Sequence, residues 1–229
     1  MVRIILKDHY RWSKLWHQAL LNFRRRIRHR IFSAIERGDD AKALRLATKR
    51  ILLRSRGEFS QSPLVAAIAA GRVDLARDFI LRGGVYAGDG SIAHAAMRGD
   101  LAVVEMLLEA NKNPDEPLPK DEFNVGYTPL MWATNRHYLP VVRALLAAGA
   151  NVDAVARDGT TAVMCTLDAA PASLEALEIL CSYKPDITKK DWRGRNLIRE
   201  ARDRERCSGK PEMRQILERY FPDTDFDAV

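Results

Sequence analysis

The stretch that decides the fold is GYTPLMWA, residues 126–133. Thr128 is placed to cap a helix N-terminus, and Pro129 suits the first helical position, where a missing N–H loses no hydrogen bond. Apolar residues then recur at helical spacing in VVRALL, residues 141–146. Gly149 follows at the place where a left-handed residue ends a helix. The stretch and its continuation therefore predict two short helices closed by a glycine turn.

The same pattern returns along the chain at a period of about 33 residues. Leu130 follows the Thr-Pro step, and each of the other units has an apolar residue at the corresponding position. The six residues in this apolar slot are Ile31, Leu64, Ile92, Leu130, Val163 and Ile198. A short connection near 83–90 is offset by a long one near 111–124, so six units stay in phase over about 31–221. Each pair of helices leaves one face uncovered, so neighbouring units must stack to be stable.

This pattern resembles the ankyrin repeat, whose mark is T-P-L-H-x-A at a period of 33. The resemblance implies an all-α solenoid of stacked helix-turn-helix units joined by short hairpin loops, with degenerate first and last units as caps. Two departures stand out. His137 replaces the usual glycine between the helices of repeat four, and His94 lies one step late in repeat three. We therefore expect the first helix of repeat three to be shifted or shortened.

Positive charge is concentrated at the N-terminus. Residues 1–30 carry nine Lys/Arg and one Asp, whereas the whole chain has a net charge of +7. Apolar residues between Trp12 and Ile27 fall on one side of a helix, which predicts a basic amphipathic helix over 1–30. Two interpretations of this helix are compatible with each other. In one, its apolar stripe packs on the first repeat; in the other, its arginines bind a polyanion. The arginines are Arg24, Arg25, Arg26, Arg28 and Arg30. We expect the other end, residues 222–229, to be an acidic disordered tail.

Composition excludes several classes of protein. An apolar fraction of 47%, with 13 Gly and 10 Pro, excludes collagen-like and wholly disordered chains. The apolar run Ile4–Leu6 is far shorter than the roughly 20 residues of a membrane span or the roughly 7–15 of a secretory signal. Three cysteines, Cys165, Cys181 and Cys207, lie far apart and form neither a disulfide framework nor a metal-binding pair. We therefore expect a cytoplasmic protein.

No motif points to catalysis. The chain lacks the phosphate-binding, dinucleotide-binding, zinc-protease and serine-hydrolase signatures, and its five histidines are scattered. Cys165 and Cys181 fall within helices and are expected in the core. We therefore expect no enzyme, no metal and no cofactor.

The ankyrin resemblance also implies where a partner binds. Such stacks offer a concave surface of hairpin tips and first helices, whose variable positions flank each tip glycine and end each first helix. Carried over, these positions are Tyr86, Asp89, Met97, Arg98, Asn124, Tyr127, Asn135, Arg136, Arg157, Trp192, Arg193 and Arg195. Tyr127, Arg136, Trp192 and Arg193 form the expected centre, because Tyr, Trp and Arg dominate binding hot spots. The alternative for Tyr127 and Trp192 is that they only cover the stacked hairpins.

Two functions follow. The first is a non-catalytic protein-protein interaction module (a scaffold, adaptor or inhibitor) that binds a protein partner and is itself monomeric. The alternative is a nucleic-acid- or anionic-membrane-associated protein that uses the Arg-rich N-terminal helix. A steep salt dependence of binding distinguishes the second function from the first.

Overall fold

The computed structural model describes residues 30–56, 61–119, 126–168, 174–208 and 211–226. These residues belong to two compact units, Met1–Gly84 and Val85–Val229, each of which we describe by itself. Within the described ranges every regular element is a helix and there is no strand. This confirms the expected all-α class.

The N-terminal unit consists of a helical segment at 30–36 and the helices α2 (Asp40–Leu46), α3 (Lys49–Arg54), α4 (Pro63–Ala69) and α5 (Val73–Leu81). Helix α5 packs against both α2 and α4. Side chains cap three of these helices, because Asp39, Thr48 and Ser62 accept hydrogen bonds from backbone N–H groups of the first turns of α2, α3 and α4. The short helices thus begin where the sequence offers an acceptor.

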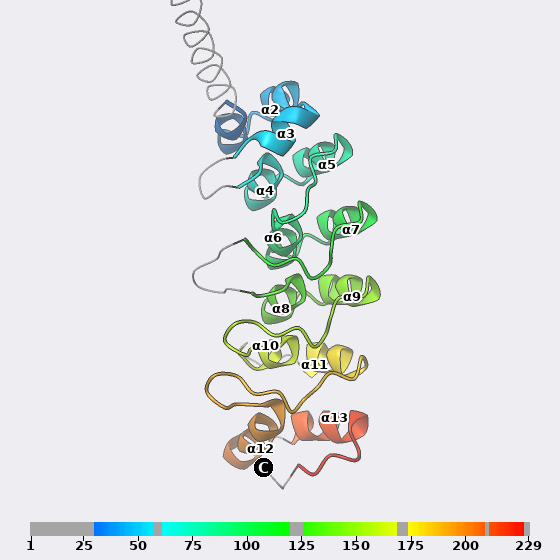
Figure 1. Ribbon diagram of the computed structural model, residues 1–229. Helices are drawn as coiled ribbons and strands as arrows, with labels where there is room; N and C mark the ends of the chain where they lie inside the picture. Colours follow the sequence, from blue (N-terminus) through cyan, green and yellow to red (C-terminus); the bar gives the residue numbers. More distant parts are fainter. Residues whose placement is uncertain (1–29, 57–60, 120–125, 169–173, 209–210, 227–229) are drawn as a thin grey trace, which may run out of the picture. The chain divides into compact units, whose positions relative to one another are not determined.

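The C-terminal unit is a succession of helical pairs. They are α6 (Ser91–Arg98) with α7 (Leu101–Glu109), α8 (Pro129–Asn135) with α9 (Leu139–Ala147), α10 (Ala162–Asp168) with α11 (Leu174–Cys181), and α12 (Leu197–Ser208) with α13 (Glu212–Tyr220). First helices α6, α8 and α10 contact one another in turn, and so do second helices α7, α9, α11 and α13 (Figure 1). The unit is therefore an all-α repeat solenoid, as expected.

The repeating apolar slot forms the core in both units. Its six residues are exposed by no more than 3%: Ile31, Leu64, Ile92, Leu130, Val163 and Ile198. Trp132, Cys165 and Cys181 are also buried, as expected. The phase derived from the sequence is thus the phase in which the helices bury their apolar faces.

Local signals in repeat four also have the expected geometry. The Thr128 hydroxyl accepts a hydrogen bond from Met131 N at 3.3 Å, and Pro129 is the first residue of α8. Gly149 has φ +83°, and His137 has φ +58°, the left-handed conformation that Gly99 adopts in repeat three. His137 therefore fills a glycine position without the conformational freedom of glycine.

Repeat three corrects one expectation. Helix α6 runs for eight residues from Ser91, whereas α4 and α8 have seven each, so the first helix is not shortened. The late His94 does not move the helix, because Ile92, Ala95 and Ala96 keep the buried register.

Part of the segment expected to be an acidic disordered tail lies within the described residues, and the tail itself stays a prediction. Residues 222–226 are placed by the structure, and Phe226 is only 5% exposed. The limits of the arm (1–30) and of the repeat domain (31–221) stay predictions. Among the described helices, none has both the length and the apolar character needed to cross a membrane.

Candidate functional site

Successive hairpin tips of the C-terminal unit lie against one another. Tip five (residues 156–160) contacts tip six (residues 191–195) through a hydrogen bond from Trp192 N to the Asp158 carbonyl oxygen, 2.8 Å long. Gly159 has φ +81°, and a Cβ there would lie 2.8 Å from the Asp191 Cα. Only glycine allows the two backbones to approach so closely. Tips five and six therefore form one continuous edge rather than separate loops.

A buried carboxylate holds tip six in shape. Asp191 Oδ1 accepts hydrogen bonds from Arg193 N at 2.9 Å and Arg195 N at 2.8 Å, and Oδ2 accepts one from Arg195 Nε at 2.8 Å. Burial alone would raise the pKa of Asp191, but these hydrogen bonds and the Arg195 charge outweigh it and lower the pKa below its ordinary value. Asp191 is therefore ionised at neutral pH, and its charge is matched by Arg195.

Trp192 stands out from this fixed tip. Trp192 is 70% exposed, and the Arg193 guanidinium carbon lies 4.7 Å from the centre of its indole ring. Such a stacked pair holds the cation beside an apolar face. Arg157 and Lys190, on tip five and just before tip six, are also exposed. We call Arg157, Lys190, Trp192 and Arg193 the Trp192 platform.

Repeat four exposes a different set of side chains. Arg136 is exposed at the end of α8, and Asn135 beside it is half-buried. Tyr127 is half-buried, and its ring packs on the buried Trp132 with centroids 5.4 Å apart. Tyr127 thus contributes to packing as well as to the surface, whereas the Trp192 indole is largely exposed.

Repeat three is the place where the expected surface and the structure disagree. Met97 is half-buried, and Arg98 is exposed and pairs with Asp100. Asp89, however, is 4% exposed and lies inside the protein, so it is not a surface contact. Tyr86 is half-buried, and its carbonyl oxygen accepts a hydrogen bond from Lys112, which lies 26 residues further along the chain.

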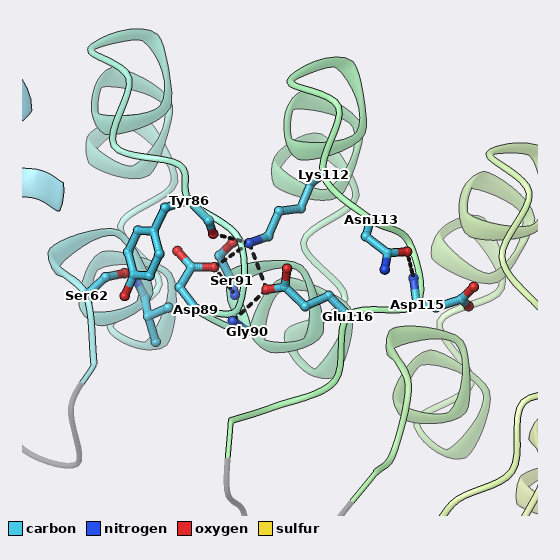
Figure 2. Close-up of polar contacts among 10 residues, drawn as sticks. Ser62, Tyr86, Asp89, Gly90, Ser91, Lys112, Asn113, Asp115 and Glu116 are labelled. Carbon is cyan, nitrogen blue, oxygen red and sulfur yellow. Dashed lines mark hydrogen bonds and ion pairs between the residues drawn. The ribbon is translucent and has the colours of Figure 1, made fainter.

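Lys112 is the centre of a buried polar cluster, Asp89–Lys112–Glu116. Its Nζ lies 2.7 Å from Asp89 Oδ1 and 2.7 Å from Glu116 Oε1. The side chains are 0% (Asp89), 3% (Lys112) and 10% (Glu116) exposed. Figure 2 shows Lys112 reaching from its loop between the two carboxylates. One buried cation therefore holds the loop after α7 against the hairpin tip before α6.

The carboxylates of the cluster also serve the start of α6. Ser91 N donates to Asp89 Oδ1 and Gly90 N donates to Glu116 Oε1, each at 2.9 Å. Burial raises the pKa of Glu116, but hydrogen bonds from Gly88, Lys112 and Gly90 and the Lys112 charge lower it below the ordinary value. Sequence reasoning missed Lys112 and Glu116. The available signal was Gly90, which stands where Thr128 caps α8 in the next repeat and offers no side-chain acceptor.

Several expected residues lie outside the described part of the chain. These are Asn124 and the basic residues Arg24, Arg25, Arg26 and Arg28, whereas Arg30 is exposed at the start of the helical segment 30–36. Within the described residues, no group of three or more His, Cys, Asp or Glu side chains is arranged to hold a metal ion. The expected positions that the structure does bring together are those of tips five and six.

Comparisons with known proteins agree with the fold. Residues 92–191 match a family model described as ankyrin repeats, three copies. An ankyrin repeat domain from Acinetobacter baumannii AYE has the same fold, with a TM-score of 0.70 and 21% identity over 83% of this chain and 96% of that one. The ankyrin repeat protein EF0377 gives a TM-score of 0.65 and 20% identity over 83% of this chain and 97% of that one. No curated protein sequence matches the chain.

The two kinds of match support each other. The family model covers the repeats with the clearest motifs, and the solved structures extend the fold over most of the chain at identities that show the fold alone. Together with the buried 33-residue register, they show that residues 92–191 are ankyrin repeats and that the chain has the fold of an ankyrin-repeat solenoid.

Proposed function

We propose that the chain is a non-catalytic scaffold, adaptor or inhibitor that binds a protein partner through its hairpin tips and first-helix ends. Ankyrin repeats are generally protein-protein interaction modules, and the family is generally non-catalytic. The absence of catalytic signatures in the sequence supports the second part of the proposal. The proposed binding of a protein partner also requires an exposed surface that a partner can contact.

The observation that carries the proposal is the exposed Trp192 on a tip held by Asp191. Exposed aromatic and arginine side chains on rigid backbone are typical of binding hot spots, because little conformational entropy is lost when a partner covers them. Arg136 at the end of α8 extends the same chemistry to repeat four. Arg98 is also exposed in the proposed interface, and half-buried residues supply the surface around it: Tyr86, Met97, Tyr127 and Asn135.

The test is quantitative affinity purification with the full chain as bait. We expect a protein recovered by the wild type to be lost with Arg136→Ala or Trp192→Ala, while both variants keep the wild-type circular dichroism spectrum. Arg143→Ala is a matched control, because Arg143 is exposed on the second helix α9. A partner that is lost with Arg143→Ala and kept by the other two variants would place the interface on the second helices instead.

The second candidate function uses the N-terminal arm. Its support is the charge of residues 1–30, nine Lys/Arg against one Asp, together with the exposed Arg30. A polyanion bound there would release counterions, so its affinity would fall steeply with salt. Changing Arg24, Arg25, Arg26 and Arg28 to Gln should abolish salt-sensitive retention on heparin, and unchanged retention would exclude this role.

We also propose a cytoplasmic location for the chain. None of the three cysteines forms a disulfide, and Cys165 and Cys181 are buried. Free thiols in an odd number suit a reducing compartment.

A further inference from the structure

The Trp192 platform has a defined local charge. Arg157, Lys190 and Arg193 are exposed. The nearby carboxylates, those of Asp158 and Asp191, already accept hydrogen bonds from other groups of the protein. Asp191 is buried and paired with Arg195, and the half-buried Asp158 directs Oδ1 to Thr160 N at 3.0 Å. The surface that a partner would meet is therefore cationic around one exposed indole.

This positive spot belongs to a unit of the opposite sign. Residues 85–229 contain 18 Lys/Arg and 23 Asp/Glu, which is a net charge of −5. A long polyanion such as a nucleic acid would meet repulsion from the rest of the unit, because its charge extends well beyond one pair of tips. A short acidic segment would meet only the platform. Charge complementarity thus favours a protein segment as the occupant.

The pair of Trp192 and Arg193 adds a second requirement. A guanidinium can bind a carboxylate with two parallel hydrogen bonds, and an indole face takes an apolar side chain next to it. The guanidinium carbon lies over the indole ring, 4.7 Å from its centre, so one hairpin tip offers both groups together. A matching ligand carries a carboxylate close to an apolar side chain.

We infer that the Trp192 platform binds an acidic segment of a partner protein in which an aspartate or glutamate lies beside an aromatic or aliphatic residue. This inference rests on the proposed protein-binding function and specifies its partner. Trp192 covers the apolar side chain, Arg193 binds the carboxylate, and Arg157 and Lys190 attract the flanking acidic residues. Added salt weakens the attraction of the flanking charges more than the central contact.

The experiment is selection from a random-peptide phage library on the immobilised full chain, followed by fluorescence anisotropy with the selected peptides. We expect peptides with Asp or Glu beside Trp, Phe, Leu or Ile. Trp192→Ala and Arg193→Gln should each weaken them about tenfold or more, as for hot-spot residues. Replacing the peptide carboxylate with the amide should have a similar effect on the wild type and little further effect on Arg193→Gln.

Matched controls separate the platform from general loss of charge or aromatic surface. Arg143→Gln removes one exposed arginine from α9, and Tyr183→Ala removes an aromatic residue that is 48% exposed. Both should bind the selected peptides like the wild type. Thermal melting of each variant confirms that it is folded.

The other outcomes overturn the inference in distinguishable ways. Selected peptides that bind Trp192→Ala and Arg193→Gln as well as the wild type would move the site elsewhere and leave the proposed function intact. Failure to select any peptide above the blank surface would count against both. A labelled single-stranded DNA that binds the chain and loses affinity with Trp192→Ala would assign the platform to nucleic acid, since bases also stack on an indole.

Discussion

Replacing Lys112 with Met tests whether the buried cluster holds repeat three together. Methionine keeps much of the length and apolar stem of lysine but removes the ammonium, so Asp89 and Glu116 lose their shared cation. Breaking a buried ion pair by removing one partner typically costs about 3–5 kcal/mol, because an uncompensated charge stays in the interior. The side chains of Asp89 and Glu116 are 0% and 10% exposed, and each lies 2.7 Å from the ammonium.

The structure places the expected loss near the lower end of that range. Asp89 and Glu116 still accept hydrogen bonds from Ser91 N and Gly90 N at the start of α6, where the helix dipole favours negative charge. We therefore expect Lys112→Met to lower the free energy of unfolding by about 3 kcal/mol. Urea unfolding of the full chain at neutral pH, followed by circular dichroism, measures this value, and hydrogen exchange of the α6 amides locates it.

A surface ion pair in the same unit provides the control. Lys189 Nζ lies 3.3 Å from Asp153 Oδ1, and its side chain is 28% exposed. Lys189→Met should therefore cost only about 0–1 kcal/mol. If Lys112→Met cost no more than Lys189→Met, the cluster would not be a structural clamp and the reasoning would be refuted.

Three further predictions concern single sites. The pKa of Glu116 is lower in the folded chain than its ordinary value of 4.5. The contribution of its charge to the free energy of unfolding is therefore fully present above pH 4.5 and is lost as the pH falls through the folded pKa. Glu116→Gln should flatten this part of the curve of stability against pH. His137→Gly should raise the free energy of unfolding by about 0.5–1 kcal/mol in urea, because the left-handed conformation is strained for histidine. Burial, together with the Glu178 charge, raises the pKa of Cys181 to about 12. Iodoacetamide should therefore label the exposed Cys207 in the native protein and spare Cys181 until the chain unfolds, as read by mass spectrometry.

The fold could be predicted because its signals are local and repeated. Leu130 and its counterparts every 33 residues or so are buried, Thr128 caps α8, and His137 adopts the conformation of the glycine it replaces. Each of these follows from a residue type and its position within one repeat. None depends on a side chain from a distant part of the chain.

The surface was predictable only in part. Trp192 and Arg193 are exposed, as their tip positions suggest, but Asp89, which the resemblance also places at a variable tip position, is buried. The difference is Lys112, which comes from the following loop 23 residues away and draws the carboxylate inward. Tyr127 shows the same limit, because its exposure depends on how its ring meets Trp132. Repeat position indicates which residues face outward, and the side chains that they meet in the folded chain then decide which of them remain accessible.

The departures of repeat three from the common pattern are best understood as one coupled change. Gly90 takes the place of a capping threonine, and its φ of +68° with Pro119 close by leaves no room for a side chain. Asp89 and Glu116 supply the missing acceptors, and Lys112 balances their charge. If this is so, the effects of Asp89→Asn and Lys112→Met should not add. Once Asp89 is neutral, removing the lysine leaves one fewer unpaired charge, so the double variant should be more stable than the sum of the single losses implies by about 1 kcal/mol or more. Urea unfolding of the four proteins of this cycle gives the coupling energy. Strict additivity would mean that the cap and the ion pair stabilise repeat three independently.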